Sequence, residues 1–190
     1  MCRLAAFSLM SLDGFFEGPA GSLDWHRVDE EFREFAVTQL EAAGTLVFGK
    51  MTFEIMSAYW NGPGSTEDPR VARLMKELPK VVVSRTLSSV CWGNSRLERD
   101  LPAAKAAWSC AGKGEALIVG SAGLTASILA RGWLSELRVM VVPVLLAEGR
   151  SYFRELEKRC PLELLKVRVF GNGNVLLKYR PSPWRSARQQ

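Results

Sequence analysis

The chain has 190 residues, of which 47% are hydrophobic, 24% charged and 9% aromatic, and this composition argues against disordered, collagen-like and coiled-coil proteins. Since one domain of this length can bury roughly 70% of its unfolded surface, we expect a single domain over residues 1–180 and a flexible polar tail over residues 181–190. The net charge of +5 suits an anionic small molecule, and no basic cluster is interleaved with aromatic residues, so nucleic-acid binding is not favoured.

The first two thirds of the chain alternate between apolar runs and helical patterns. Apolar runs over residues 4–10, 45–48, 80–84 and 116–119 predict buried strands. Helices are predicted between and after them, over residues 32–43 with Gly44 as the terminator, over 53–60, through Val71 and Met75, over 102–110 behind an Asp100 cap, and over 121–131 before Gly132. Residues 61–69 read as a loop. This alternation predicts an α/β fold with a mostly parallel sheet flanked by helices on both faces.

The pattern changes after Trp133, where strands follow one another without long helices. They are predicted over residues 137–144, 162–170 and 175–179. The last two are separated by residues 171–174, whose Asn172–Gly173 pair is typical of a type I′ hairpin turn. We therefore expect an antiparallel hairpin to complete the sheet at its C-terminal end.

Four turns follow the predicted parallel strands, and ligands of such sheets bind at the carboxyl ends of the strands. Two of the turns, 49–52 and 120–123, open helices, whose first backbone amides attract anions. A third presents Arg85 between two hydroxyls, and the fourth carries a single carboxylate, Asp13. Each signal is weak by itself, because a glycine after a strand is usually only a tight turn. Together they predict a groove for a cofactor with a pyrophosphate and a third phosphate.

Six segments carry a more specific resemblance: residues 11–14 (SLDG), 46–54 (LVFGKMTFE), 80–87 (KVVVSRTL), 92–94 (WGN), 119–124 (VGSAGL) and 135–149 (SELRVMVVPVLLAEG). In this order and spacing they resemble the reductase domain of the riboflavin-biosynthesis deaminase–reductase family, which has a dihydrofolate reductase-like fold. The resemblance extends over residues 2–180. We expect a free-standing member, since no deaminase segment precedes these motifs.

The resemblance implies an NADPH-dependent oxidoreductase that transfers hydride to a pyrimidine- or pteridine-like substrate, as 5-amino-6-(5-phosphoribosylamino)uracil reductase does. It implies that Gly49, Lys50 and Thr52 hold cofactor phosphates. It assigns Ser84, Arg85 and Thr86 to the adenosine 2′-phosphate, for which a planar guanidinium with flanking hydroxyls is well suited. The pyrophosphate and nicotinamide side is assigned to Gly120, Ser121, Ala122, Gly123 and Leu124.

The sequence departs from the family pattern at four places. Lys50 stands where arginine is common, Ser121 where a second glycine is frequent, Ser135 where aspartate is common, and Ala147 where a glycine is common. In dihydrofolate reductases the corresponding Gly–Gly link is cis, and a non-proline cis bond costs about 3 kcal/mol. These departures keep open an alternative, a nucleotide-binding or scaffold protein of the same fold without turnover.

Asp13 and Trp25 are the candidates for the substrate side. If an apolar pocket raised its pKa, the Asp13 carboxyl could deliver or relay the proton that reduction of a C=N bond requires. The competing interpretation is that an aspartate before Gly14 only makes a turn. Trp25, beside His26, could stack on a planar heterocycle, although a tryptophan near a helix start more often belongs to the core.

The remaining composition bears on location and assembly. Four cysteines without a C-x-x-C pair, and a start without a signal-cleavage site, predict a cytoplasmic protein with reduced thiols. The single histidine leaves almost no material for a His-based metal site, so no metal is expected. The run 139–147, broken by Pro143, is too short to span a membrane. The family commonly dimerises, and the apolar run 139–146 and the late strands offer surface for a homodimer.

Overall fold

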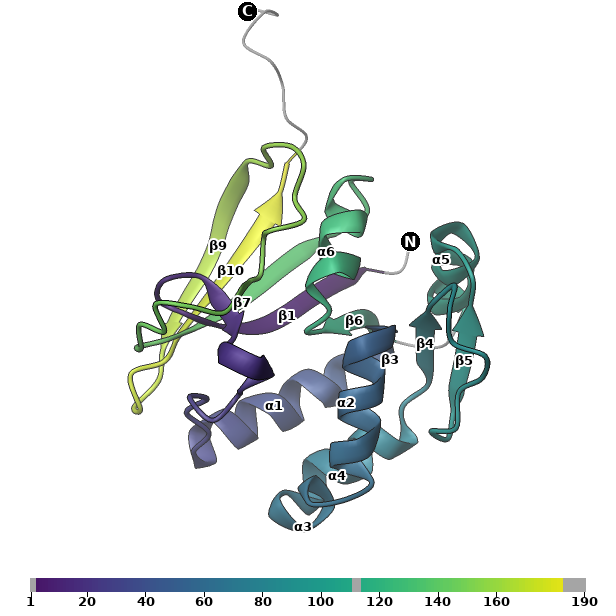
Figure 1. Cartoon of the computed structure of the whole chain (residues 1–190), viewed down its shortest axis with the longest axis horizontal. Helices are drawn as coiled ribbons and strands as arrows, with labels where there is room; N and C mark the ends of the chain where they lie inside the picture. Colours follow the sequence, from purple (N-terminus) through teal and green to yellow (C-terminus); the bar gives the residue numbers. More distant parts are fainter. Residues whose placement is uncertain (1–2, 111–113, 183–190) are drawn as a thin grey trace, which may run out of the picture.

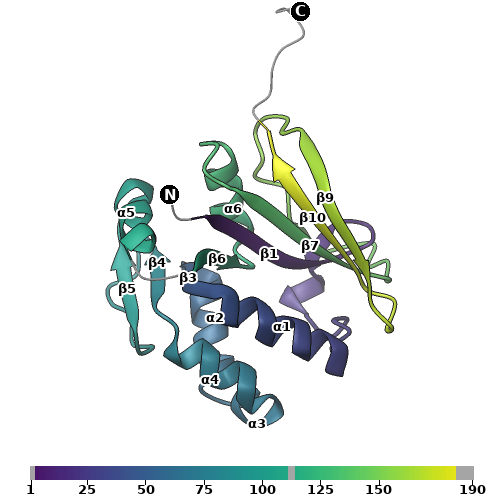
Figure 2. The ribbon, with the colours of Figure 1, turned by 180° about the vertical axis from the view of Figure 1, so that it is seen from behind.

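An eight-stranded sheet runs through the computed structural model, which describes residues 3–110 and 114–182 (Figures 1 and 2). Its strand order is β5-β4-β3-β6-β1-β7-β10-β9. The first six strands in that order are parallel: β5 (Ser95–Glu98), β4 (Lys80–Val83), β3 (Ala43–Gly49), β6 (Glu115–Val119), β1 (Leu4–Ser11) and β7 (Glu136–Val142). The hairpin of β9 (Leu162–Val169) and β10 (Val175–Pro181) adds to β7 in the antiparallel sense. The predicted α/β architecture with its C-terminal antiparallel hairpin is confirmed.

Helices cover both faces of the sheet, as predicted. Successive strand residues point to opposite faces, so Phe48 joins one hydrophobic cluster and Val47 the other. The Phe48 cluster takes in the helices α1 (Glu30–Ala42), α2 (Lys50–Trp60) and α4 (Pro69–Glu77). The Val47 cluster takes in α5 (Leu101–Cys110) and α6 (Ala122–Leu129). The remaining elements are small: β2 (Phe15–Glu17), β8 (Arg150–Ser151), a 3-10 turn at Pro19–Gly21 and α3 (Gly64–Glu67).

Three helices begin at an aspartate whose carboxylate accepts a hydrogen bond from the backbone amide three residues later. Asp29 caps α1, Asp68 caps α4, and Asp100, as the sequence predicts, caps α5 with its Oδ1 2.8 Å from the Ala103 amide. Such a cap is worth about 1 kcal/mol, because it satisfies one of the four amide donors that a helix leaves unpaired at its start. The start of these helices is therefore determined locally.

Several local predictions were wrong. Gly44 does not terminate α1: the helix ends at Ala42, and the chain passes into β3 at the extended Ala43, so Gly44 lies inside the strand. The loop 61–69 contains the short helix α3. Strand β5 was missed because this edge strand carries the polar sequence SRLE, without an apolar run.

The turn between β9 and β10 also differs from its prediction. Gly173 has a positive φ of 89°, but Asn172 does not, whereas a type I′ turn needs both. The Gly173 amide donates to the Phe170 carbonyl at 3.0 Å, and the Phe170 amide donates to the Asn174 carbonyl at 2.9 Å. The loop is thus longer than two residues, with the left-handed residue at its third position. Of the predicted tail, Pro181 belongs to β10, and residues 183–190 lie outside the described residues.

No helix in the described part of the chain is long and apolar enough to cross a membrane.

Candidate cofactor site

The four predicted ligand turns lie along one edge of the sheet. They follow β4, β3, β6 and β1, which are contiguous in the strand order and parallel, so their carboxyl ends share this edge. The predicted residues are therefore neighbours in space, although more than 100 residues separate Asp13 from Ser121 along the chain. The order of strands, which the turns themselves do not encode, creates this arrangement.

Two of these turns are joined directly by side-chain hydrogen bonds. The Gly49 amide donates to Ser121 Oγ at 3.0 Å, and the Ser121 amide donates to Thr52 Oγ1 at 3.1 Å. Gly120 packs tightly on the same threonine, since a Cβ there would lie 3.3 Å from Thr52 Cγ2. The starts of α2 and α6 are therefore held side by side.

Ser121 adopts a backbone conformation that favours glycine. Its φ of 53° and ψ of 62° are left-handed, as is the φ of 64° at Gly120. A left-handed L-residue costs about 1–2 kcal/mol, and here its two hydrogen bonds offset that cost. The structure describes no cis peptide bond, so the link between these two residues is trans.

Helices α2 and α6 differ from the aspartate-capped helices, because neither has a side-chain cap. Gly49 has no side chain to offer, and Ser121 turns its hydroxyl toward the Gly49 amide instead of toward α6. The first amides of both helices are left for another acceptor, and their positive dipole ends favour an anion. Lys50 is exposed at the start of α2, while Ala122 is buried and Gly123 and Leu124 are half-buried at the start of α6.

The turn after β4 is built from Ser84, Arg85 and Thr86. Ser84 Oγ accepts hydrogen bonds from the amides of Thr86 at 3.2 Å and Leu87 at 3.0 Å, which fixes the turn. Arg85 and Thr86 are exposed, and Arg85 makes no ion pair within the described residues. Its guanidinium is therefore available to an anion.

Arg99 donates hydrogen bonds to the backbone of this turn, a role that was not predicted from the sequence. Its guanidinium donates to the carbonyls of Ser84 at 3.2 Å, Ser88 at 3.4 Å and Leu87. Arg99 thus provides a hydrogen-bond donor for three backbone carbonyls next to Arg85. Its place directly after the unpredicted strand β5 is the reason that no sequence pattern pointed to it.

The segment after β8 covers the start of α6 and was also missed. The Glu155 carboxylate lies against Gly123, where a Cβ would overlap it, and Arg150 Nη2 donates to Glu155 Oε1 at 3.1 Å. The buried Tyr152 hydroxyl anchors the segment by donating to Thr125 Oγ1 at 3.1 Å, and burial raises its pKa to about 12. A carboxylate of the chain itself therefore stands beside the amides expected to take the pyrophosphate.

Asp13 binds the backbone of a distant loop in this structure. Its carboxylate is exposed and accepts hydrogen bonds from Ser11 Oγ at 2.6 Å, Leu146 N at 3.0 Å and Ala147 N at 2.8 Å. The Ser11 hydroxyl has the largest effect and lowers the pKa of Asp13 below its ordinary value; desolvation opposes it, and the two amides lower the pKa further. A raised pKa for Asp13 was considered from the sequence, and that direction is wrong. Ala147 has a φ of 65°, a backbone conformation that favours glycine.

Trp25 is half-buried, and its indole N–H donates to the Ser22 carbonyl at 3.1 Å. It meets the His26 ring edge-on, with 4.4 Å between centroids. Burial lowers the pKa of His26 to about 4, so its imidazole is neutral. Neither of these contacts joins Trp25 to the four turns, and its role in stacking on a substrate stays a prediction.

Residues 3–176 match the RibD C-terminal domain family. The chain belongs to this family. It is 27% identical over 180 residues to the uncharacterized protein YyaP of Bacillus subtilis (strain 168), covering 90% of each chain. The RibD-type, reductase-like assignment predicted from the six segments is confirmed.

Solved structures share the fold. A putative riboflavin biosynthesis protein from Shewanella sp. PV-4 superposes with a TM-score of 0.74 at 22% identity, over 95% of this chain and 99% of that one. A deaminase/5-amino-6-(5-phosphoribosylamino)uracil reductase from Thermotoga maritima gives 0.70 at 13% identity, over 95% and 57%. Dihydrofolate reductase from Enterococcus faecalis, complexed with NADP(H), gives 0.64 at 16% identity, over 95% and 97%. The dihydrofolate reductase-like fold of this family member is thereby shown.

Proposed function

We propose that this family member is an NADPH-dependent reductase that binds its cofactor along the carboxyl edge of β4, β3, β6 and β1. One observation carries the proposal: α2 and α6, which open side by side at that edge, both lack a side-chain cap, whereas α1, α4 and α5 are capped by aspartates. Two adjacent sets of free amides suit the phosphates of a dinucleotide. Gly49, Lys50, Thr52, Ala122, Gly123 and Leu124 would line that contact.

The choice of NADPH over NADH rests on the turn after β4. Arg85 is exposed and unpaired within the described chain, and Ser84 and Thr86 hydroxyls stand beside it, 3.5 Å apart. A dianionic 2′-phosphate would bind a planar guanidinium and these hydroxyls, whereas NADH offers only a hydroxyl there. The turn is already formed by the Ser84 and Arg99 hydrogen bonds, so little ordering is needed on binding.

The substrate class is proposed to be a pyrimidine- or pteridine-like heterocycle, following the family and the activities named for its structural neighbours. Bound NADPH would supply the hydride. In this chain Asp13 would hold the loop of Leu146 and Ala147 at the rim, and Trp25 would stack on the ring. Because its pKa is lowered, the Asp13 carboxyl stays ionised at neutral pH, so it would orient a proton donor such as a water instead of donating a proton itself.

The proposal is tested by titrating the purified chain with NADPH and NADH and following intrinsic fluorescence. Saturable NADPH binding, tighter than NADH binding, is the expected result. Absence of saturation at millimolar NADPH would overturn the proposal. The Arg85→Ala variant should lose affinity for NADPH and keep its affinity for NADH.

A second candidate is a nucleotide-binding protein of the same fold without turnover. The serine at position 121 and the alanine at position 147, which stand where the family pattern has glycine, favour it. NADPH consumption is followed with a panel of pteridines, pyrimidine nucleotides and small carbonyl compounds. Tight binding with no consumption across the panel would select this candidate over the reductase.

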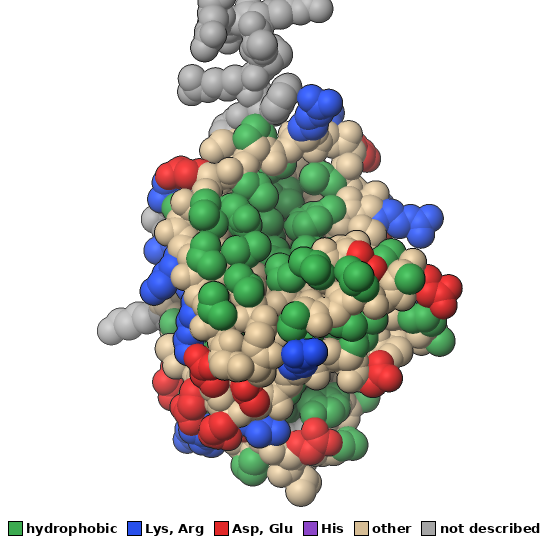
Figure 3. All heavy atoms as spheres, turned by 90° about the vertical axis from the view of Figure 1, so that its left-hand side faces the viewer, with side chains coloured by type: hydrophobic (Ala, Val, Ile, Leu, Met, Phe, Trp, Pro, Cys, Tyr) green, Lys and Arg blue, Asp and Glu red, His purple; other side chains and the backbone are tan. Residues whose placement is uncertain are grey.

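We further propose that the protein is a homodimer joined through β9. All eight residues of this edge strand are exposed, including Leu162, Leu164, Leu165, Val167 and Val169. Figure 3 shows hydrophobic side chains gathered on this side of the molecule. An exposed apolar edge strand pairs readily with another chain, and a second copy presents the same surface.

Location in the cytoplasm is likewise a proposal. Within the described residues Cys91 and Cys160 carry free thiols, as expected in a reducing compartment.

A further inference from the structure

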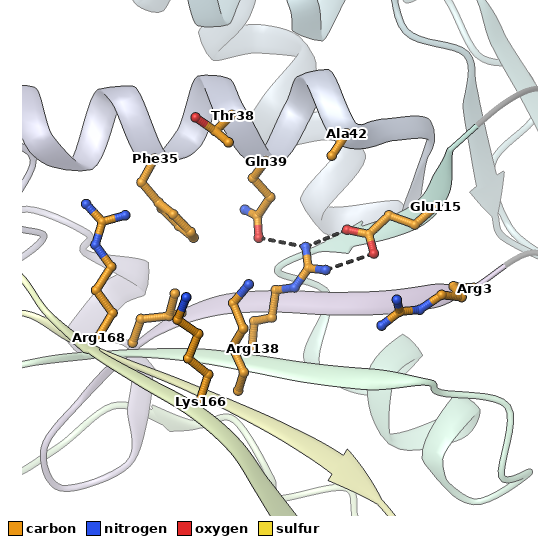
Figure 4. A pocket seen from close by; sticks show the side chains of 11 residues that line it. Arg3, Phe35, Thr38, Gln39, Ala42, Glu115, Arg138, Lys166 and Arg168 are labelled. Atoms are coloured by element: carbon orange, nitrogen blue, oxygen red, sulfur yellow. Dashed lines mark hydrogen bonds and ion pairs between the residues drawn. The ribbon is translucent and has the colours of Figure 1, made fainter.

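A cavity of about 470 Å³ lies on the α1 face of the sheet, between α1 and the C-terminal hairpin (Figure 4). Arg3 precedes β1, and Glu115 is the first residue of β6, so this part of the cavity wall is at the amino end of the parallel strands. The proposed cofactor edge is at their carboxyl end. The cavity is therefore a separate feature, with a volume typical of small-molecule sites.

Three cationic residues form one row along the cavity. Arg138 of β7 pairs in register with Lys178 of β10, which in turn pairs with Lys166 of β9. Residues directly opposite in antiparallel strands project to the same face, and all three line the cavity. Like charges placed opposite each other destabilise a sheet, so the stability of the sheet does not explain this row.

Arg138 already pairs with Glu115, which lines the cavity, and with Glu136 beside it. This side chain, in a residue only 7% exposed, meets Glu115 Oε1 at 2.6 Å and Glu136 Oε1 at 2.6 Å. It also donates to Gln39 Oε1 at 3.1 Å. The structure thus neutralises the innermost cation of the row completely.

The outer two cations are not neutralised in the same way. Lys178 Nζ lies 3.9 Å from Glu136 Oε1, but the same carboxylate also pairs with Arg138 and Arg3. Burial, and then the nearby Arg138 guanidinium, lower the pKa of the Lys178 ammonium. Lys166 has no hydrogen bond or ion pair with any described residue. Two neighbouring ammonium groups therefore lack a full counter-charge.

An apolar surface stands next to these ammonium groups. Phe35 of α1 and Leu176 of β10 are buried in the core and reach the cavity. At the mouth, Arg168 is held by Glu31 at 2.8 Å and by stacking over Phe170 at 4.3 Å, so its guanidinium is fixed in place. A wall of apolar side chains with a few fixed charges is the usual composition of a site for an organic ligand.

We propose that this cavity binds a small organic phosphate, with its dianionic phosphate between Lys166 and Lys178 and its apolar body against Phe35 and Leu176. A dianion matches two adjacent ammonium groups and relieves their repulsion. The exposed Val167 and Val169 alternate with Lys166 and Arg168 along β9, so the apolar surface proposed for the dimer lies on the other face of the strand.

The test is calorimetric titration of the full chain with phenyl phosphate, with phenol as the uncharged control. Wild type is expected to bind phenyl phosphate but not phenol. Lys166→Gln and Lys178→Gln should each weaken binding about tenfold or more, because each removes one charged contact. Lys76→Gln, which removes the same charge from the exposed surface of α4, should bind as wild type does.

Two further readouts distinguish a ligand site from a cluster of charges that only supports the fold. Without ligand, Lys166→Gln should melt at the same temperature as wild type or higher, since a repulsion is removed, whereas a lower melting temperature would indicate a structural role and contradict the proposal. Undetectable binding of phenyl phosphate to wild type at millimolar concentration would overturn the proposal, and so would binding to both lysine variants that is as tight as binding to wild type. If phenyl phosphate binding were lost in Arg85→Ala but kept in both lysine variants, the phosphate would bind at the cofactor edge, and this result would also overturn the proposal. NADPH binding is expected to be unchanged in Lys166→Gln, so the two proposals fail independently.

Discussion

The amide of Gly49 donates a hydrogen bond to the hydroxyl of Ser121 at 3.0 Å, which joins the end of β3 to the start of α6. Ser121 makes this bond from a left-handed backbone conformation, with φ 53°. The Ser121 hydroxyl makes this contact and does not cap α6, so the start of the helix stays open for a ligand.

Two substitutions of Ser121 distinguish the contribution of its hydrogen bond to stability from the cost of its left-handed backbone. Ser121→Ala loses the acceptor and keeps the unfavourable φ, so we expect the free energy of unfolding to fall by about 1–2 kcal/mol. Ser121→Gly loses the acceptor but relieves the strain and should cost less than the alanine variant. Urea unfolding measures both. An alanine variant as stable as wild type would show that the hydrogen bond contributes nothing.

Arg99 should influence cofactor choice although it lies behind Arg85. Arg99→Ala leaves the carbonyls of Ser84, Leu87 and Ser88 without their donor, so the turn loosens and the Kd for NADPH should rise several-fold. The Kd for NADH should change little, because NADH has no 2′-phosphate. Fluorescence titration of both cofactors makes the comparison. An equal loss for NADPH and NADH would indicate that Arg99 acts only on stability.

Glu155 should weaken cofactor binding in the wild-type protein. Glu155→Gln removes the negative charge beside Gly123 and takes one ion-pair partner from Arg150, so affinity for NADPH should increase several-fold, most strongly at low salt. Glu157→Gln is the matched control, since it removes the same charge from an exposed position on the same segment. Equal affinities of Glu155→Gln and wild type would show that the carboxylate does not compete with the cofactor.

The single histidine gives the protein a defined acid sensitivity. Burial lowers the pKa of His26 from 6.5 to about 4, so below pH 6.5 the unfolded chain binds a proton that the folded chain does not. Stability should therefore fall as pH decreases from 6.5 to 4. His26→Phe should show a flatter dependence over this range, measured as melting temperature at each pH. A slope equal to that of wild type would contradict the buried neutral imidazole.

The β9 surface should control assembly. Val167→Lys places a charge on the proposed dimer surface and should shift the protein from dimer to monomer in size-exclusion chromatography with light scattering. Ile55→Lys on α2 is the matched control, because Ile55 is 47% exposed and Val167 is 48% exposed. A monomeric wild type, or dimers in both variants, would refute this surface.

The sequence by itself was sufficient for most of the local elements and for their order. The apolar period, the Asp100 cap and the six family segments all lie within short stretches of chain, so most strands and helices and the positions of the four turns could be predicted. Elements without such a local signal were missed or misread, as at β5 and at Gly44.

Only the tertiary structure decided what these residues contact. Which way the Ser121 hydroxyl turns, that Asp13 binds the amides of Leu146 and Ala147, and that Glu155 lies against Gly123 depend on crossovers between distant segments. The row of Arg138, Lys178 and Lys166 depends on the register of the strands. A shift of one residue in a strand would turn its side chains to the opposite face of the sheet. Side-chain direction, charge balance and pKa follow from these long-range contacts, and for that reason they are not encoded in any one segment.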